Sequence, residues 1–245
     1  DLEYLRRERR VKALVVRVDS PGGEVAASQE IHAALLRFRT ETALPVVASF
    51  GGVAASGGYY IACAADRIVA NPGTLTGSIG VILTYANAEG LLERVGIRFR
   101  SVQSGQMKDQ GAFWRDLTDE ERAVLQGTVD DVYDQFLEVV EQGRGMSREE
   151  IAPYADGRTL SGRQARQAGL VDSLGDLSVA IDLAKSLGGL DEDAPVHRPR
   201  KPREGILDRL LEGSAALPAL LEPGVRIEYR LAPHLGGGVV GGRAR

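Results

Sequence analysis

The chain is poor in several residue types on which whole classes of protein depend. Its single cysteine, Cys63, cannot form a disulfide within the chain, and its small-residue surroundings predict a buried position. No run of 18 apolar residues occurs, so we predict no membrane-spanning helix within these residues. The net charge is −4 and the one basic run, residues 198–204, is short and lacks interleaved aromatic residues, so we expect no nucleic-acid partner.

Histidine is almost as scarce, with only His32, His197 and His234. His32 lies among apolar residues at helical spacing, which predicts a helix-face residue rather than a catalytic base. The other two lie in an irregular tail. A Ser-His-Asp triad is therefore weakly supported, and we expect no metal or cofactor.

Lysine is rare as well, since 26 of the 30 basic residues are arginine. Arginine cannot lose its proton in a protein, whereas lysine can when it is shielded from water, so each remaining lysine is a potential base. Lys12 opens a strand, Lys185 lies on a polar helix face and Lys201 lies in the basic run. Lys108, in the turn-rich SGQMKDQG, is the candidate general base, and the alternative is an ordinary solvated loop lysine.

Small residues are abundant in GGVAASGGYY, residues 51–60, where one serine, Ser56, follows the apolar run 45–50. Glycines on both sides of Ser56 let other backbone approach closely. We expect Ser56 near a helix N-terminus, where free N–H groups favour negative charge on an attacking oxygen. The alternative is a small-residue packing site between helix and sheet.

A second glycine-rich turn follows the apolar strand Ala13–Val18 and reads Asp-Ser-Pro-Gly-Gly, residues 19–23. Such a turn can aim backbone N–H groups outward. Gly22 and Gly23 are therefore candidates for an oxyanion hole, whose donors must point at the charge that develops on a substrate oxygen.

The order of predicted elements indicates an α/β fold with a largely parallel sheet. Strands are predicted near 12–18, 45–50, 66–70, 79–85 and 97–103, and helices near 24–38, 54–65 and 87–95. A capping box formed by Thr118 and Glu121 opens a long amphipathic helix that runs to Gly143, and Ser161 with Gln164 opens another. The composition shifts near residue 192, so we predict a catalytic domain over 1–192 and a partly flexible tail over 193–245, with a short apolar helix near 206–211.

These motifs together resemble the bacterial signal peptide peptidase A (protease IV) family. The resemblance runs over about residues 10–190, through VKALVVRVDSPGGEV, PVVASFGGVAASGGYYIACAADRIVANPGTLTGSIGVI, SVQSGQMKD and GRTLSGRQARQAGLVDSLGD. It implies the Clp protease/crotonase fold with repeated β-β-α units. It also implies that Ser56 is the nucleophile of a Ser-Lys dyad, Lys108 its general base, Ser78 the residue that orients the lysine amine, and Gly22 an oxyanion-hole residue.

The resemblance further implies a ring-like homo-oligomer in which a serine of one subunit meets a lysine of its neighbour. Hydrophobic peptides, such as released signal peptides and membrane-associated protein fragments, would be its substrates. It places the catalytic domain outside the cytoplasm at the bacterial cell membrane, with a membrane anchor and a first strand that this chain does not include. Two other function classes stay open: a crotonase-like acyl-CoA enzyme, which gives Ser56 and Lys108 no role, and a catalytically silent scaffold.

Overall fold

The main sheet is built around its longest strand, β3. The computed structural model describes residues 2–198 and 226–230. The sheet contains β1 (Leu14–Ser20), β3 (Val46–Ala55), β4 (Arg67–Ala70), β5 (Leu75–Gly77), β7 (Thr159–Ser161) and β8 (Ser173–Leu174). On one edge of β3 lies β1, and on the other lie β4 and then β5, all parallel to it. β8 continues the parallel pairing from β4, and only β7 is antiparallel, so the predicted α/β fold with a largely parallel sheet is confirmed.

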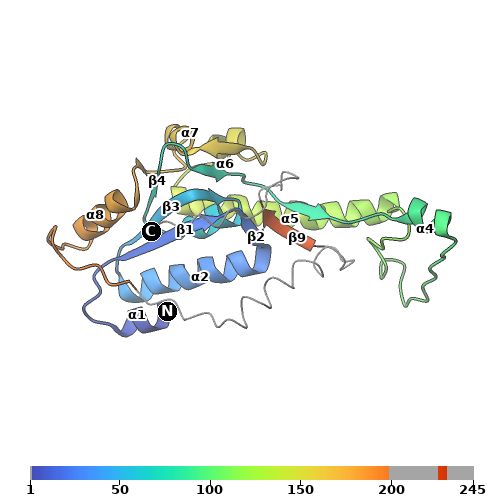
Figure 1. Cartoon of the computed structure of the whole chain (residues 1–245), viewed down its shortest axis with the longest axis horizontal. Helices are drawn as coiled ribbons and strands as arrows, with labels where there is room; N and C mark the ends of the chain where they lie inside the picture. Colours follow the sequence, from blue (N-terminus) through green and yellow to red (C-terminus); the bar gives the residue numbers. More distant parts are fainter. Residues whose placement is uncertain (1, 199–225, 231–245) are drawn as a thin grey trace.

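Helices cover both faces of this sheet (Figure 1). They are α1 (Leu2–Arg7), α2 (Val25–Thr42), α3 (Gly57–Ala62), α6 (Arg148–Ile151), α7 (Gly162–Gln167) and α8 (Leu177–Leu187), with a 3-10 turn at Ala152–Tyr154. Successive side chains of a strand point to opposite faces. Phe50 therefore packs in the core that includes α2 and α3, whereas Val47 packs on Ala180 and Ala184 of α8.

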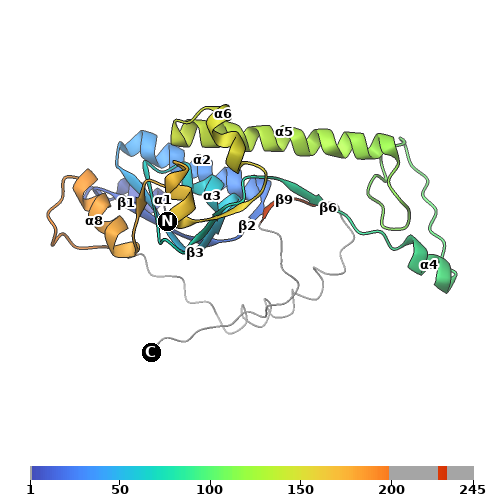
Figure 2. The same cartoon turned by 90° about the horizontal axis from the view of Figure 1, so that it is seen from above.

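Helix α5 (Asp119–Arg144) joins this body to a projecting segment, as Figure 2 shows. Its 26 residues span about 39 Å at 1.5 Å per residue. Near its C-terminal end it lies directly against α3, because a Cβ on Gly143 would lie 2.4 Å from the carbonyl oxygen of Cys63. Cys63 itself is buried, as the sequence predicts. At its other end, the predicted capping box of Thr118 and Glu121 is present.

The projecting segment, residues 85–117, is called the arm here and carries α4 (Glu89–Val95). The prediction of a strand at 97–103 is wrong, because these residues form no regular secondary structure. A strand needs the backbone hydrogen bonds of a partner, and no strand within the described part of the chain lies alongside them. Their side chains are exposed, and that of Val102 fully so.

A second, three-stranded sheet contains β2 (Gly22–Glu24), β6 (Ile82–Thr84) and β9 (Arg226–Arg230). The central strand is β9, which is antiparallel to both neighbours. It comes from the segment predicted to be a tail, so part of that segment is a strand packed beside the catalytic domain. The predicted apolar helix at 206–211 lies outside the described residues.

Several predicted boundaries also shift. The strand predicted to end at Phe50 continues to Ala55, and α3 begins at Gly57 rather than at 54. The strand predicted over 79–85 is limited to Ile82–Thr84, and β5 precedes it. Of the helices that the structure describes, none combines the length and the apolar character needed to cross a membrane.

Candidate active site

Ser56 occupies the junction between β3 and α3, at the N-cap of the helix. Its backbone has φ 53° and ψ −116°, a conformation that residues other than glycine rarely adopt. The side chain is fully buried, and its Oγ has no hydrogen-bond partner among the described residues. A strained backbone and an unpaired buried hydroxyl are each costly, and their coincidence at one residue indicates a functional role.

The glycines around Ser56 are required by close backbone contacts. A Cβ on Gly58 would lie 2.9 Å from the carbonyl oxygen of Ser20, so the Ser-Pro-Gly-Gly turn packs directly on the first turn of α3. A Cβ on Gly51 would lie 2.4 Å from Cγ of Asp19. The Asp19 carboxylate accepts a 3.0 Å hydrogen bond from the N–H of Val53 and fills this space.

Ser78 lies at the end of the neighbouring strand. The N–H of Ser56 donates to the carbonyl oxygen of Gly77 at 2.8 Å, and Ser78 is the next residue. Ser78 is also buried, with a positive φ of 50°, and its N–H donates to the carbonyl oxygen of Arg158 at 2.8 Å. The structure therefore places Ser78 beside the Ser56 junction.

The third strand end, that of β1, brings in Gly22 and Gly23. Ser20 pairs with Ala54, two residues before Ser56, and the register shifts just before this pair. Gly22 has φ 103°, which only glycine adopts readily, and its N–H donates to Ser20 Oγ at 3.2 Å. Gly23 has open space where a side chain would stand. The C-terminal ends of three adjacent parallel strands thus meet at Ser56, which is where open α/β sheets place their ligand sites.

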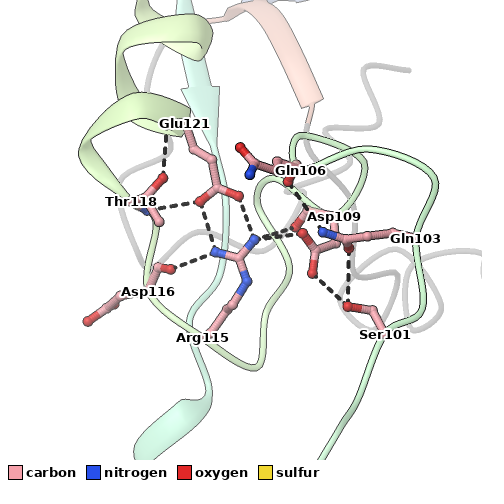
Figure 3. A network of polar contacts seen from close by, with 8 residues as sticks. All are labelled: Ser101, Gln103, Gln106, Asp109, Arg115, Asp116, Thr118 and Glu121. Carbon is pink, nitrogen blue, oxygen red and sulfur yellow. Dashed lines mark hydrogen bonds and ion pairs between the residues drawn. The ribbon is translucent and has the colours of Figure 1, made fainter.

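Lys108 is not at this junction within its own chain. It is exposed in the arm, and its N–H donates to the carbonyl oxygen of Gly105. The following residue, Asp109, is bound through Arg115 to Glu121 at the first turn of α5 (Figure 3). The contact of α5 with α3 is at the opposite end of that helix. The arm and the Ser56 junction are therefore separated by most of the length of α5.

His32 and a cluster of aromatic side chains lie in different parts of the molecule, the body and the arm. His32 lies on α2, buried with its ring against Tyr60, and burial with the nearby Arg39 charge lowers its pKa to about 4. Trp114 does not enter the core but stacks on Phe99, and Phe113 packs edge-on against both rings. Among the described residues no group of three or more His, Cys, Asp or Glu side chains is placed to hold a metal ion.

Sequence reasoning missed two features of this arrangement. The positive φ of Ser56 and Ser78 has no sequence signal, because neither is a glycine or an asparagine. The link from Asp109 through Arg115 to Glu121 was also missed, since its members stand six residues apart and follow no helical or strand period. Only the capping box pointed to Glu121.

Comparisons with known proteins give the family of the chain. The model of Peptidase family S49 matches residues 39–191, which include Ser56, Ser78 and Lys108. Together with the α/β fold, this match defines the class of the protein as a serine peptidase, a hydrolase.

Individual relatives give the same result. The protein slr0021 of Synechocystis sp., provisionally named a protease, is 44% identical over 88% of this chain and 77% of its own length. A protein of Enterococcus faecium, provisionally named signal peptide peptidase SppA, is 38% identical over 75% of this chain and 53% of its own length. Protease 4 of Salmonella typhi is 39% identical over 76% of this chain and 30% of its own length. The chain belongs to peptidase family S49, and the predicted resemblance and its Clp protease/crotonase-like fold are confirmed.

Proposed function

We propose that this chain is a Ser-Lys endopeptidase in which Ser56 is the nucleophile and Lys108 of another copy is the general base. The observation that carries the proposal is the state of Ser56. Its hydroxyl is buried and has no hydrogen-bond partner among the described residues, and its backbone is strained. A serine hydroxyl needs an adjacent base to attack a carbonyl carbon. Among the described residues none is placed to serve as this base, since the His32 ring packs against Tyr60 and Lys108 lies in the arm.

The chemistry follows from these positions. The neutral Lys108 amine takes the Ser56 proton, and Oγ attacks the peptide carbonyl to form a tetrahedral oxyanion. The N–H of Gly22, released from Ser20 Oγ, and the neighbouring amides, with that of Gly23 a further candidate, stabilise this charge. The C–N bond then breaks with return of the proton to the leaving amine, and water hydrolyses the acyl-enzyme. Ser78 orients the lysine amine.

The exposed apolar side chains of the arm support contact with a second copy. Five large ones are exposed there: Leu91, Val95, Ile97, Phe99 and Val102. Exposed apolar groups at this density on one segment indicate an interaction surface. An arm that packs on a neighbouring body would cover these groups and bring Lys108 to a second Ser56. A head-to-tail contact of this kind closes into a ring when its rotation permits.

The second sheet supports an extended peptide as the substrate. Strand β9 lies antiparallel between β2 and β6, and its Arg230 pairs with Gly22 of the candidate oxyanion turn. A substrate strand in the same place would gain the same backbone hydrogen bonds and pass close to the Ser56 junction. The Enterococcus faecium relative is named as a signal peptide peptidase, which favours signal peptides as substrates. We therefore propose that the chain cleaves hydrophobic peptides, such as released signal peptides, and that its catalytic domain acts at the bacterial cell membrane.

A fluorophosphonate that reacts with activated serines tests the nucleophile. We expect covalent labelling at Ser56, located by mass spectrometry of the digested protein, and its complete loss in Ser56→Ala. Labelling that persists in Ser56→Ala, or an unlabelled wild-type protein that still cleaves peptides, contradicts this assignment.

Substitution of the base gives a second test. Lys108→Arg keeps a long basic side chain that cannot accept a proton because arginine stays charged, so peptide cleavage should fall by at least about 1,000-fold. Lys12→Arg, at an exposed lysine just before β1, is the matched control and should retain activity. Near-normal turnover in Lys108→Arg would exclude Lys108 as the base.

A further inference from the structure

The loop that carries Lys108 has its own polar anchor. Arg115 reaches two carboxylates at once: Nη2 lies 2.7 Å from Oδ1 of Asp109, and Nη1 lies 2.8 Å from Oε2 of Glu121 (Figure 3). A guanidinium that bridges two carboxylates fixes direction as well as distance, because its donors form a rigid planar fork. Asp109 directly follows Lys108, so this bridge ends one residue from the proposed base.

One end of the bridge is held in a rigid element. Glu121 is 3% exposed and belongs to the capping box of α5, in which the N–H of Thr118 donates to Oε2 at 2.9 Å and the N–H of Glu121 donates to Thr118 Oγ1 at 3.2 Å. The hydrogen bonds from Arg115 and Thr118 lower the pKa of Glu121 to about 2, so the carboxylate stays charged. The bridge is therefore anchored at the first turn of the 26-residue helix α5.

The other end holds a segment that has little else to fix it. Ser101 Oγ donates to the second carboxylate oxygen of Asp109 at 2.9 Å, so the strand-less stretch 97–103 is fastened to the same residue. The arm from Ile97 to Gln103 has no sheet pairing within the described part of the chain. The bridge joins the Lys108 loop to α5, and the Phe99, Phe113 and Trp114 ring cluster adds contacts within the arm.

We propose that Arg115 is a positioning residue for Lys108: the Asp109–Arg115–Glu121 bridge holds the lysine loop at the end of α5 in the place from which its amine reaches the serine of another copy. The inference rests on the proposed Ser-Lys function. A base delivered across a subunit contact must be held closely, because misplacement by about 1 Å is enough to cost two orders of magnitude in rate. Arg115 itself contacts neither the substrate nor Ser56.

The competing explanation is that the bridge only stabilises α5. Both explanations predict some loss of stability when Arg115 is replaced, so activity alone does not separate them. They differ in where the defect lies. A positioning role places it on the lysine side of a shared site and leaves the Ser56 junction of the same subunit intact.

Mixed oligomers separate the two explanations. Arg115→Gln should lower kcat by roughly 100-fold with little change in KM, because the proposed place of the substrate, between β2 and β6, lies in the body. After subunit exchange, Arg115→Gln mixed with Ser56→Ala should regain activity, since one variant supplies an intact serine and the other an intact lysine loop. Arg115→Gln mixed with Lys108→Ala should regain none, since both defects lie on the lysine side.

Three controls complete the design. Asp109→Asn should behave as Arg115→Gln does, which covers the case in which Arg115→Gln fails to fold, and thermal melting verifies folding of each variant. Arg122 is an exposed arginine on the same turn of α5 as Glu121, and Arg122→Gln should have wild-type kcat. Exchange of subunits is verified by native mass spectrometry.

The outcomes are distinguishable. Wild-type kcat in both bridge variants overturns the positioning role. Recovery of Ser56→Ala with Lys108→Ala, but not with the bridge variants, also overturns it, because the defect is then not confined to the lysine side. No recovery in the Ser56→Ala and Lys108→Ala mixture overturns the shared site, and with it this inference.

Discussion

Ser56 carries backbone strain that its neighbours impose. Its φ of 53° follows a strand that ends in small residues and precedes a helix whose second residue is packed on the Ser20 carbonyl. Such a conformation costs about 1–3 kcal/mol in a residue with a side chain. The strain holds Oγ at the junction of three strand ends, and this position is what the proposed chemistry needs.

Relief of that strain should be measurable. Ser56→Gly and Ser56→Ala both remove the hydroxyl and should both be inactive. The observed φ and ψ lie in a region open to glycine, so Ser56→Gly should be the more stable of the two by about 1 kcal/mol, even after the greater freedom of glycine in the unfolded chain. Urea unfolding of the two variants measures the difference. Equal stabilities, or a more stable alanine variant, would show that the backbone is not strained.

His32 makes a second prediction at this scale. Its pKa in the folded protein is lowered to about 4 by burial and by Arg39, from an ordinary 6.5. The unfolded chain therefore binds a proton at pH values where the folded protein does not, so stability falls as pH falls from about 6.5 towards 4, by at most roughly 3 kcal/mol. His32→Phe, which keeps a ring against Tyr60, should lose this part of the pH dependence in urea unfolding. The same slope in both proteins over this range would contradict the assignment.

At the scale of elements, sequence patterns predicted the helices and turns that depend on contacts between residues close in sequence. The capping box and apolar stripe of α5 identify that helix, and the small-residue run 51–58 identifies the junction around Ser56, because each depends on contacts close in sequence. The pattern at 97–103 failed because the alternation of Ile97 and Phe99 with arginines describes a strand only if a partner is present. Strand β9 was missed because its pairing with β2 and β6 is entirely long-range, so no pattern local to its five residues identifies it.

Strand β9 itself leads to a prediction about activity. If it occupies the place of an extended substrate, its removal should open that place. Ile227 pairs with Leu83 of β6. Ile227→Pro removes a backbone N–H from β9, and proline is not tolerated in the middle of a central strand. We expect higher cleavage of a hydrophobic peptide and a lower KM than in the matched Ile227→Val. Unchanged or reduced cleavage in Ile227→Pro would contradict a shared place for β9 and substrate.

At the scale of the whole molecule, the two halves of the proposed dyad lie in different parts. The body presents Ser56, Ser78 and Gly22 on adjacent strand ends. Lys108 belongs to the arm, and Figure 2 shows the arm projecting beyond the far end of α5. All four residues were predicted from the sequence, and they stay predictions. That Lys108 would come from another copy was implied only by the family resemblance, because residue patterns in a single sequence do not tell which copy supplies a residue. The exposed apolar side chains of the arm are the structural reason to expect a neighbour there.

Peptidase activity of mixed variants tests the central claim most directly. Ser56→Ala and Lys108→Ala are each expected to be inactive alone. After mixing in equal amounts and verified subunit exchange, a site shared between neighbours pairs an intact serine with an intact lysine in about one quarter of cases, so we predict about a quarter of wild-type activity. Activity that stays at the level of the separate variants would contradict a Ser56–Lys108 dyad built across two copies.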